Sequence, residues 1–407
     1  MNVSNTAFLC GYFTAAGTAS SPAGWTPVAG DAAQEALLRK FYFPEFVDFH
    51  TREVRRFTLP VDREVTLPLR SGAEVPFRVE ELRLWLMPCS LVIFAVRTVF
   101  TGQAFDAVTE ALNTLRNCSF YADASLGGFM EAAIRPLNAM YTSLSGRELP
   151  ADDSYTHLVE NGNKFKIFQI ITSPDCPAGY EERNRLLYAA GTVSRYEAAP
   201  PFSTDPAYYE QLMKAHRLGV FSSWTALALL DTVTFLGSGI SPFQQGIWIE
   251  DYFGRIYIYE LFRKCFLYHH NLLFRTGRRD PVVLQEELTD FERHYTFTSV
   301  SYNFLPAEVD EAIVRGLGVE KEEASLARLV AQEVTAREEE SAGKRDRFLL
   351  FLTCLASLSA VWDISCLLDE LINYEHTFPV ANWGYRLFSA VLLLLIAFVA
   401  WRSGKKK

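Results

Sequence analysis

The sequence FLLFLTCLASLSAVWDISCLL (348–368) is apolar over almost its whole length, with Asp363 as its one charged residue. A helix that crosses a bilayer needs about 20 such residues. A second apolar segment, YRLFSAVLLLLIAFVAW (385–401), follows a short acidic-polar stretch, 369–384. The pattern predicts two membrane-spanning helices joined by a loop. The alternative is a buried helical hairpin of a soluble core, which is disfavoured because the second segment has no polar face.

Charges beside the two segments predict their orientation. Basic residues precede the first segment in GKRDR (343–347) and follow the second in RSGKKK (402–407). The stretch between them instead carries Asp369, Glu370 and Glu375. Because basic flanks stay on the cytoplasmic side, we expect both chain ends in the cytoplasm, the loop 369–384 outside it, and a basic cytoplasmic tail.

The stretch between the segments contains a motif. It reads LINYEHTFPVANWGY (371–385), in which Asn373 precedes an aromatic residue and Glu375, and Trp-Gly-Tyr leads into the second segment. This resembles the CorA family of magnesium channels, whose external loop has Gly-Met-Asn, an aromatic, Glu and Trp-Gly-Tyr. The likeness covers only the C-terminal part of the chain. Leu371 and Ile372 replace the signature Gly and Met, which adds bulk and removes backbone freedom beside Asn373.

The resemblance implies a multi-pass protein of the inner (plasma) membrane of a prokaryote, assembled as a homopentamer. It implies that Asn373 and Glu375 form the pore mouth and the ion-selective site. Mg²⁺ or another divalent cation would be the transported or regulatory ion, and no covalently bound cofactor is implied. Oligomerisation is also a physical expectation, because two spans are too few to enclose a pathway for a hydrated ion.

One face of the first segment is the candidate pore lining. Small and hydroxyl residues lie in its cytoplasmic half, and larger aliphatic residues lie toward the loop. These residues are Thr353, Ser357, Val361, Ile364, Leu368 and Leu371. Asp363 lies on an adjacent face, and an intramembrane carboxylate usually faces protein or water. It either lines the pore or pairs with a neighbouring subunit.

The preceding region, 301–347, is predicted to be a stalk. Residues 320–347 are rich in Ala, Glu, Arg and Leu and lack proline, so they favour a helix that continues into the first apolar segment. A helix from Glu320 to about Glu370 would be about 75 Å long. The alternative is a turn at Gly343. The run Glu338–Glu340 could bind regulatory cations between stalks, but a solvated helix face is the favoured interpretation.

Residues 1–300 are predicted to form a cytoplasmic regulatory domain of αβα type, which gives the chain the α+β class. Alternating apolar residues predict strands, and amphipathic patterns predict helices. The predicted strands are 1–19, 53–61, 63–69, 75–88, 90–100, 164–174 and 221–235. The predicted helices are 102–118, about 241 to 274, and 281–297, and a break is expected at 298–306.

Composition and motifs argue against several classes of function. The net charge of −9 argues against direct nucleic-acid binding, and seven scattered cysteines without a CxxC pair predict reduced thiols. The chain has no Walker loop, GxSxG or HExxH, so we expect no enzyme and assign no catalytic residue or metal ligand. His269 and His270 diverge by about 100° on a helix and are expected to pack rather than to bind a metal. The GSG at 237–239 is expected to form a turn.

The predicted function is a CorA-like cation channel or transporter gated through its cytoplasmic domain. The alternative is a membrane effector of a type III CRISPR system, opened by a nucleotide second messenger such as an adenosylmethionine–AMP conjugate, which permeabilises the membrane in antiphage defence. The stretch 248–275, with Arg255, Arg263 and Arg275, is a conceivable wall for such an adenine-nucleotide ligand or equally a buried helix, and no ligand site is assigned. A third class is a non-conducting membrane scaffold.

Overall fold

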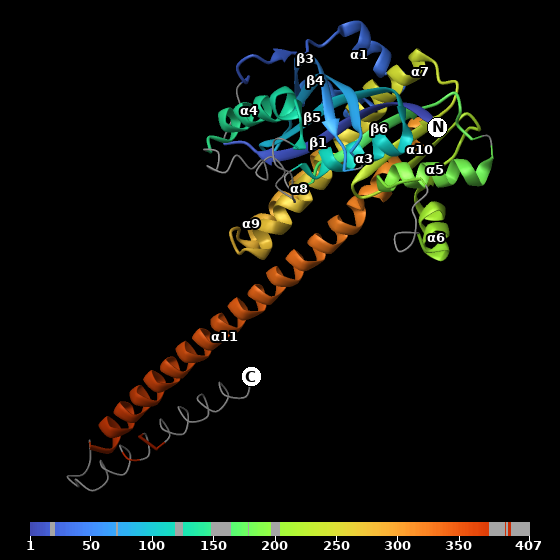
Figure 1. The fold of residues 1–407 in the computed structure, drawn as a ribbon. Helices are drawn as coiled ribbons and strands as arrows, with labels where there is room; N and C mark the ends of the chain where they lie inside the picture. Colours follow the sequence, from blue (N-terminus) through green and yellow to red (C-terminus); the bar gives the residue numbers. More distant parts are fainter. Residues whose placement is uncertain are drawn as a thin grey trace. The chain divides into compact units, whose positions relative to one another are not determined.

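The computed structural model describes residues 1–16, 21–70, 72–118, 125–147, 164–177, 179–196, 204–373, 387 and 390–391. The chain divides into two units, Met1–Ala327 and Arg328–Lys407. The first unit contains a β-sheet with helices, which confirms the mixed α+β class. The long helix predicted near the C-terminus is also present, and Figure 1 shows the elements.

A mixed sheet forms the centre of the first unit. In the described residues it has nine strands, in the order β2-β3-β4-β5-β1-β6-β9-β8-β7, and only the β6–β9 pair is parallel. The strands are β1 (Asn2–Thr14), β2 (Thr26–Pro27), β3 (Arg55–Pro68), β4 (Glu74–Leu86), β5 (Leu91–Ala104), β6 (Lys166–Thr172), β7 (Arg217–Leu218), β8 (Trp224–Ala228) and β9 (Thr232–Gly237). The apolar β1 lies between β5 and β6, where both of its faces can be buried.

Three helices pack on one face of this sheet. They are α3 (Phe105–Arg116), α4 (Arg135–Ser145) and α5 (Tyr180–Thr192). Their apolar residues, such as Leu112 and Leu137, share one hydrophobic cluster with Leu9 of β1 and Phe94 of β5. The amphipathic pattern that predicted α3 therefore places its apolar side on the sheet.

One continuous helical segment packs on the other face. α7 (Pro242–Ile247), the π-helix η6 (Trp248–Tyr257) and α8 (Ile258–Arg275) follow one another, which confirms the helix predicted from 241 to 274. Phe253 of η6 is fully buried and stacks on Phe8 of β1, with ring centroids 3.8 Å apart. It also contacts Phe168 of β6 at 5.2 Å. Each aromatic pair of this kind adds about 0.5–1.5 kcal/mol beyond area burial.

The predicted strands 53–61 and 63–69 are in fact one strand, β3. Its pairing with β4 shifts register between Pro60 and Arg63. Asp62 has a φ of 44° at this point, so the strand accommodates an irregular residue without ending. The polar and proline residues that suggested a boundary mark a bulge instead.

The single strand predicted at 221–235 is likewise wrong, because β8 and β9 form an antiparallel hairpin. The Leu229 N–H donates to the Thr232 carbonyl at 2.7 Å and closes the turn. Apolar residues on both sides of this short turn hid it in the sequence.

Seven further helices complete the described part of the first unit. They are α1 (Ala32–Leu38), α2 (Pro44–Asp48), η1 (Phe49–Glu53), η4 (Met130–Ile134), α6 (Pro206–His216), α9 (Pro281–Tyr295) and α10 (Phe304–Leu317). α9 confirms the helix predicted at 281–297, whereas α10 begins inside the segment predicted as a break. Pro306 lies in the first turn of α10, where a proline is tolerated. Gly318, with a φ of 66°, ends α10.

The last described element, α11, runs from Val319 to Asn373 without interruption. Its first residues belong to the first unit, where Glu323 pairs with Arg263 of α8 at 3.1 Å and Glu322 pairs with Lys264. In the second unit, Gly343 is helical, so the turn considered at this position does not occur. The helix has 55 residues, which corresponds to about 80 Å.

Candidate functional site

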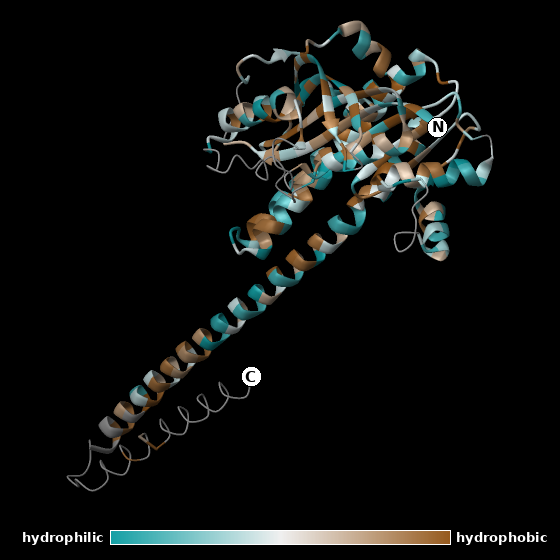
Figure 2. Cartoon of the chain, viewed as in Figure 1, coloured by the Kyte–Doolittle hydropathy of each residue, from teal (hydrophilic) through white to brown (hydrophobic). Residues whose placement is uncertain are grey.

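The C-terminal part of α11 exposes many apolar side chains. The exposed fraction is 58% for Phe348, 63% for Trp362 and 73% for Leu371. By length and composition α11 could cross a membrane, and none of its most apolar 18-residue window is buried. Figure 2 shows apolar residues gathering in this part of the helix. Such a surface marks a site that contacts lipid or protein.

Hydroxyl groups on this helix are satisfied by its own backbone. The Thr353 hydroxyl donates to the Leu349 carbonyl and the Ser357 hydroxyl donates to the Thr353 carbonyl, each at 2.8 Å. Both side chains can therefore enter an apolar environment without losing a hydrogen bond.

The six candidate pore-lining residues all lie on α11. At 3.6 residues per turn they fall within about 80° of the helix circumference. They are Thr353, Ser357, Val361, Ile364, Leu368 and Leu371. Asp363 lies about 120° from the centre of this stripe. Within the described part of the chain, Asp363 is exposed and has no ion-pair partner.

The candidate pore mouth lies at the end of the described residues. Asn373 is the last residue of α11, so the helix extends past the predicted boundary at Leu368, but the side chain of Asn373 is outside the described set. Glu375 and most of the predicted second segment, 385–401, lie outside the described residues, as does the tail 402–407. The candidate pore-lining stripe and the backbone of Asn373 therefore belong to one continuous helix.

Two other sequence candidates contact neighbouring residues of their own helices. His270 places its Nδ1 2.9 Å from the Phe266 carbonyl, and its ring packs against the Phe266 ring in a tilted arrangement, with centroids 3.8 Å apart. On α11, Glu340 pairs with Lys344 at 2.8 Å on an exposed face. No group of three metal-ligand side chains occurs among the described residues.

The three arginines of the conceivable ligand wall have different surroundings. Arg263 bonds Glu260 and Glu323, and Arg275 bonds Asn271 at 3.0 Å. Arg255 of η6 is 3% exposed and lines two cavities, of about 420 and 650 Å³. Gln34 and Leu38 of α1 line both as well, so the cavities adjoin within the first unit.

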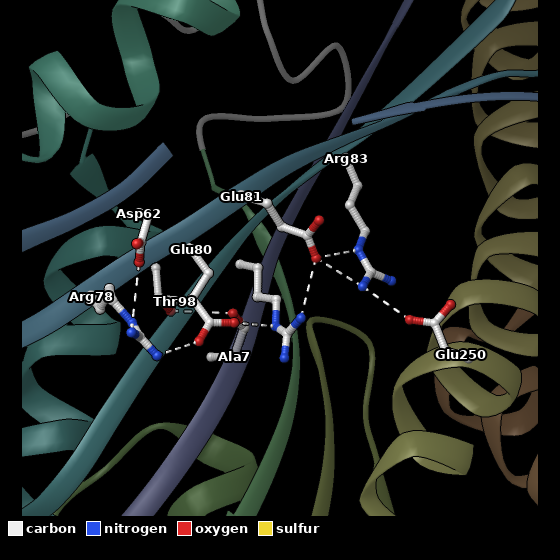
Figure 3. Close-up of polar contacts among 9 residues, drawn as sticks. Ala7, Asp62, Arg78, Glu80, Glu81, Arg83, Thr98 and Glu250 are labelled. Carbon is white, nitrogen blue, oxygen red and sulfur yellow. Dashed lines mark hydrogen bonds and ion pairs between the residues drawn. The ribbon is translucent and has the colours of Figure 1, made fainter. Parts of the chain in front are cut away.

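The sheet carries an ion-pair network beside these cavities. Figure 3 shows Arg83 between Glu81 and Glu250, at 2.8 and 3.0 Å. Arg78 lies between Asp62 and Glu80, at 3.6 and 2.7 Å. The charge of Arg83 is therefore balanced within the protein.

Sequence reasoning missed two residues of the 420 Å³ cavity, His50 of η1 and Arg56 of β3. The basic cluster HTREVRR (50–56) was a signal that could have indicated them. Residues 53–56 of this cluster belong to the strand predicted at 53–61.

Against known proteins, no family model matches the chain and no curated protein matches it.

Proposed function

We propose that this chain is a CorA-like membrane protein, a homo-oligomeric cation channel gated through its N-terminal unit, with both termini in the cytoplasm. The observation that carries the proposal is the exposed apolar surface of α11. The loop motif that follows α11 in the sequence supports the family. No enzymatic role is proposed.

In this proposal the two faces of α11 have different environments. The stripe from Thr353 to Leu371 faces other copies of the helix around a pore, and residues such as Phe348 and Trp362 face lipid or the second segment. Hydroxyl groups near one end and aliphatic residues near the other would form a pore with a hydrophobic constriction, which can close by dewetting. The family likeness favours five copies and makes Asn373 and Glu375 the ring that meets Mg²⁺ or another divalent cation.

Reconstitution into liposomes tests this function. Influx of Mg²⁺ and of monovalent cations is followed for the purified full chain, for Asn373→Ala, and for Gln332→Ala as a matched control on the charged part of α11. Selective flux that is lost in Asn373→Ala and kept in Gln332→Ala supports the channel. Intact vesicles without flux under any condition contradict it and favour a scaffold.

A second arm adds candidate adenine-nucleotide messengers to the same vesicles. Vesicles that become permeable only with a messenger would support the alternative, a CRISPR-associated effector that permeabilises the membrane. Flux that is closed by internal Mg²⁺ and unaffected by nucleotides supports a magnesium channel.

A further inference from the structure

The adjoining cavities of the first unit differ in chemistry. The 420 Å³ cavity is lined by His50, Arg56 and Arg255, among others. The 650 Å³ cavity beside it is lined by Leu37, Phe41, Tyr42 and Phe243 on its apolar side. Binding sites for small molecules commonly combine an apolar body with a few polar anchors.

The polar cavity has two side chains whose hydrogen-bonding capacity is unused. His50 is 4% exposed, and neither ring nitrogen has a partner among the described residues. Burial, together with Arg255 and Arg56, lowers the pKa of His50 well below its usual value, so the ring is neutral with one N–H to donate. Buried polar groups in native proteins are nearly always paired, so an unpaired histidine here indicates an absent partner.

Arg56 is the second side chain whose hydrogen-bonding capacity is unused. It is half-buried and lines the polar cavity, and its guanidinium makes no hydrogen bond or ion pair with the described part of the chain. Burial and the neighbouring Arg255 and Arg83 lower its pKa, while Glu250 opposes them. A guanidinium that is held near other cations, with a free donor fork, favours an anion with two acceptor oxygens.

The acidic groups around the polar cavity are already engaged. Arg255 pairs with Asp251 and donates to the Glu250 carbonyl at 2.8 Å. Asp31 accepts from the Ala33 N–H at 2.9 Å, and Glu35 pairs with Arg39 at 2.8 Å. Asp31 keeps its negative charge, and Arg56 adds to the cavity a positive charge that no ion pair within the described residues balances.

The backbone adds an independent observation. His50 lies in the π-helix η1 and Arg255 in the π-helix η6, and both line the same cavity. π-Helical turns are rare and frequently occur at functional sites.

We propose that these cavities bind a small organic oxyanion, a phosphate or carboxylate, whose headgroup is held by Arg56 and His50 and whose apolar body occupies the neighbouring cavity. The site belongs to the first unit alone. The existence of this site does not depend on the channel function. If the chain is a channel, binding of such a ligand would regulate its gating.

The probes are inorganic phosphate and acetate for the headgroup, and phenyl phosphate and benzoate for the headgroup with a body. Binding to the full chain in detergent is followed by thermal unfolding and calorimetry at constant ionic strength. We expect saturable binding of at least one of the two headgroup classes, tighter when the phenyl group is present. The two series distinguish a phosphate ligand from a carboxylate.

Three variants locate the site. Arg56→Gln should weaken binding about tenfold or more, since it removes a charge-assisted contact. Phe243→Ala, at an exposed position, should remove the advantage of the phenyl group without changing the affinity for the headgroup alone. Arg135→Gln, at an exposed arginine of α4, should change neither.

Equal responses of the wild-type chain and Arg56→Gln to all four anions would overturn the proposal. So would the absence of a saturable response to any of them in the folded wild-type chain. If the wild-type chain shows no channel flux in liposomes but still binds the anion, the proposed function is overturned and this site is not.

Discussion

Phenylalanine side chains in the two units have opposite surroundings. In the first unit Phe253 is fully buried and contacts Phe8 and Phe168, whereas Phe348 and Phe351 in the second unit are each 58% exposed. Burying such a side chain contributes about 1.5–3 kcal/mol. The first unit obtains this stabilisation from its own sheet and helices. The apolar part of α11 does not obtain it from the first unit, and such an exposed apolar surface is typical of a site that contacts lipid or protein.

The largest difference between the units is expected when one phenylalanine in each is truncated to alanine. Phe253→Ala should reduce the free energy of unfolding of the first unit by about 3–5 kcal/mol, because it leaves a cavity against the sheet. Phe348→Ala should change it by less than about 0.5 kcal/mol. Denaturant unfolding followed by tryptophan fluorescence in detergent measures both. Equal losses of unfolding free energy in the two variants would show that the two side chains have similar surroundings.

A charge near the middle of the apolar segment tests its environment. Leu358→Arg should oppose membrane insertion by about 2.5–3.5 kcal/mol, the cost of arginine at the centre of a spanning helix. The membrane-bound fraction of the chain should fall, whereas Gln332→Arg, in the exposed charged part of α11, should leave it unchanged. An unaffected fraction in Leu358→Arg would place this segment in water.

Carboxylates provide a third contrast. Glu260 is fully buried beside Arg263, with Nη1 3.1 Å from both carboxylate oxygens, and burial raises its pKa from 4.5 to about 7. The nearby Asp310 also has a raised pKa, chiefly through burial. On α11, by contrast, the Lys344 ammonium lowers the pKa of the exposed Glu340.

The raised pKa of Glu260 predicts a direction for the pH dependence of stability. The folded state binds more protons than the unfolded state between pH 4.5 and 7, so stability should fall as pH rises through this range. The change in the free energy of unfolding is on the order of 3 kcal/mol. Glu260→Gln should flatten this slope in denaturant titrations, and Glu340→Gln should preserve it. A slope unchanged by Glu260→Gln would contradict the assignment.

The smallest expected effect concerns continuity of α11. Space around Gly343 is open, so Gly343→Ala should stabilise the local helix by about 1 kcal/mol. Amide hydrogen exchange near this residue should slow about fivefold. Faster exchange in the alanine variant would show that a break, rather than a helix, is preferred here.

Local sequence patterns predicted much of the first unit. The apolar runs of β1, β5 and β6 and the amphipathic pattern of α3 were sufficient to predict these elements. Each pattern lies within one continuous stretch of sequence. The bulge at Asp62 and the turn at Leu229 depend on tertiary pairing, which propensity alone does not encode. The start of α10 was missed because the break predicted at 298–306 covers its first turn, in which Pro306 is tolerated.

The two candidate sites were predictable to different degrees. The apolar part of α11 is a continuous segment, so composition alone indicated it. The cavity joins His50 and Arg56 to Arg255, which lies about 200 residues later in the sequence. Only the packing of η6 against the sheet brings these side chains together, and no local pattern carries that information.

Membrane insertion of α11 is measured most directly by alkaline extraction of membranes that contain the full chain. If the apolar part of α11 lies in lipid, as proposed, the protein should stay in the membrane fraction after extraction at high pH and should be released only by detergent. Recovery of the folded chain in the aqueous supernatant would contradict this proposal.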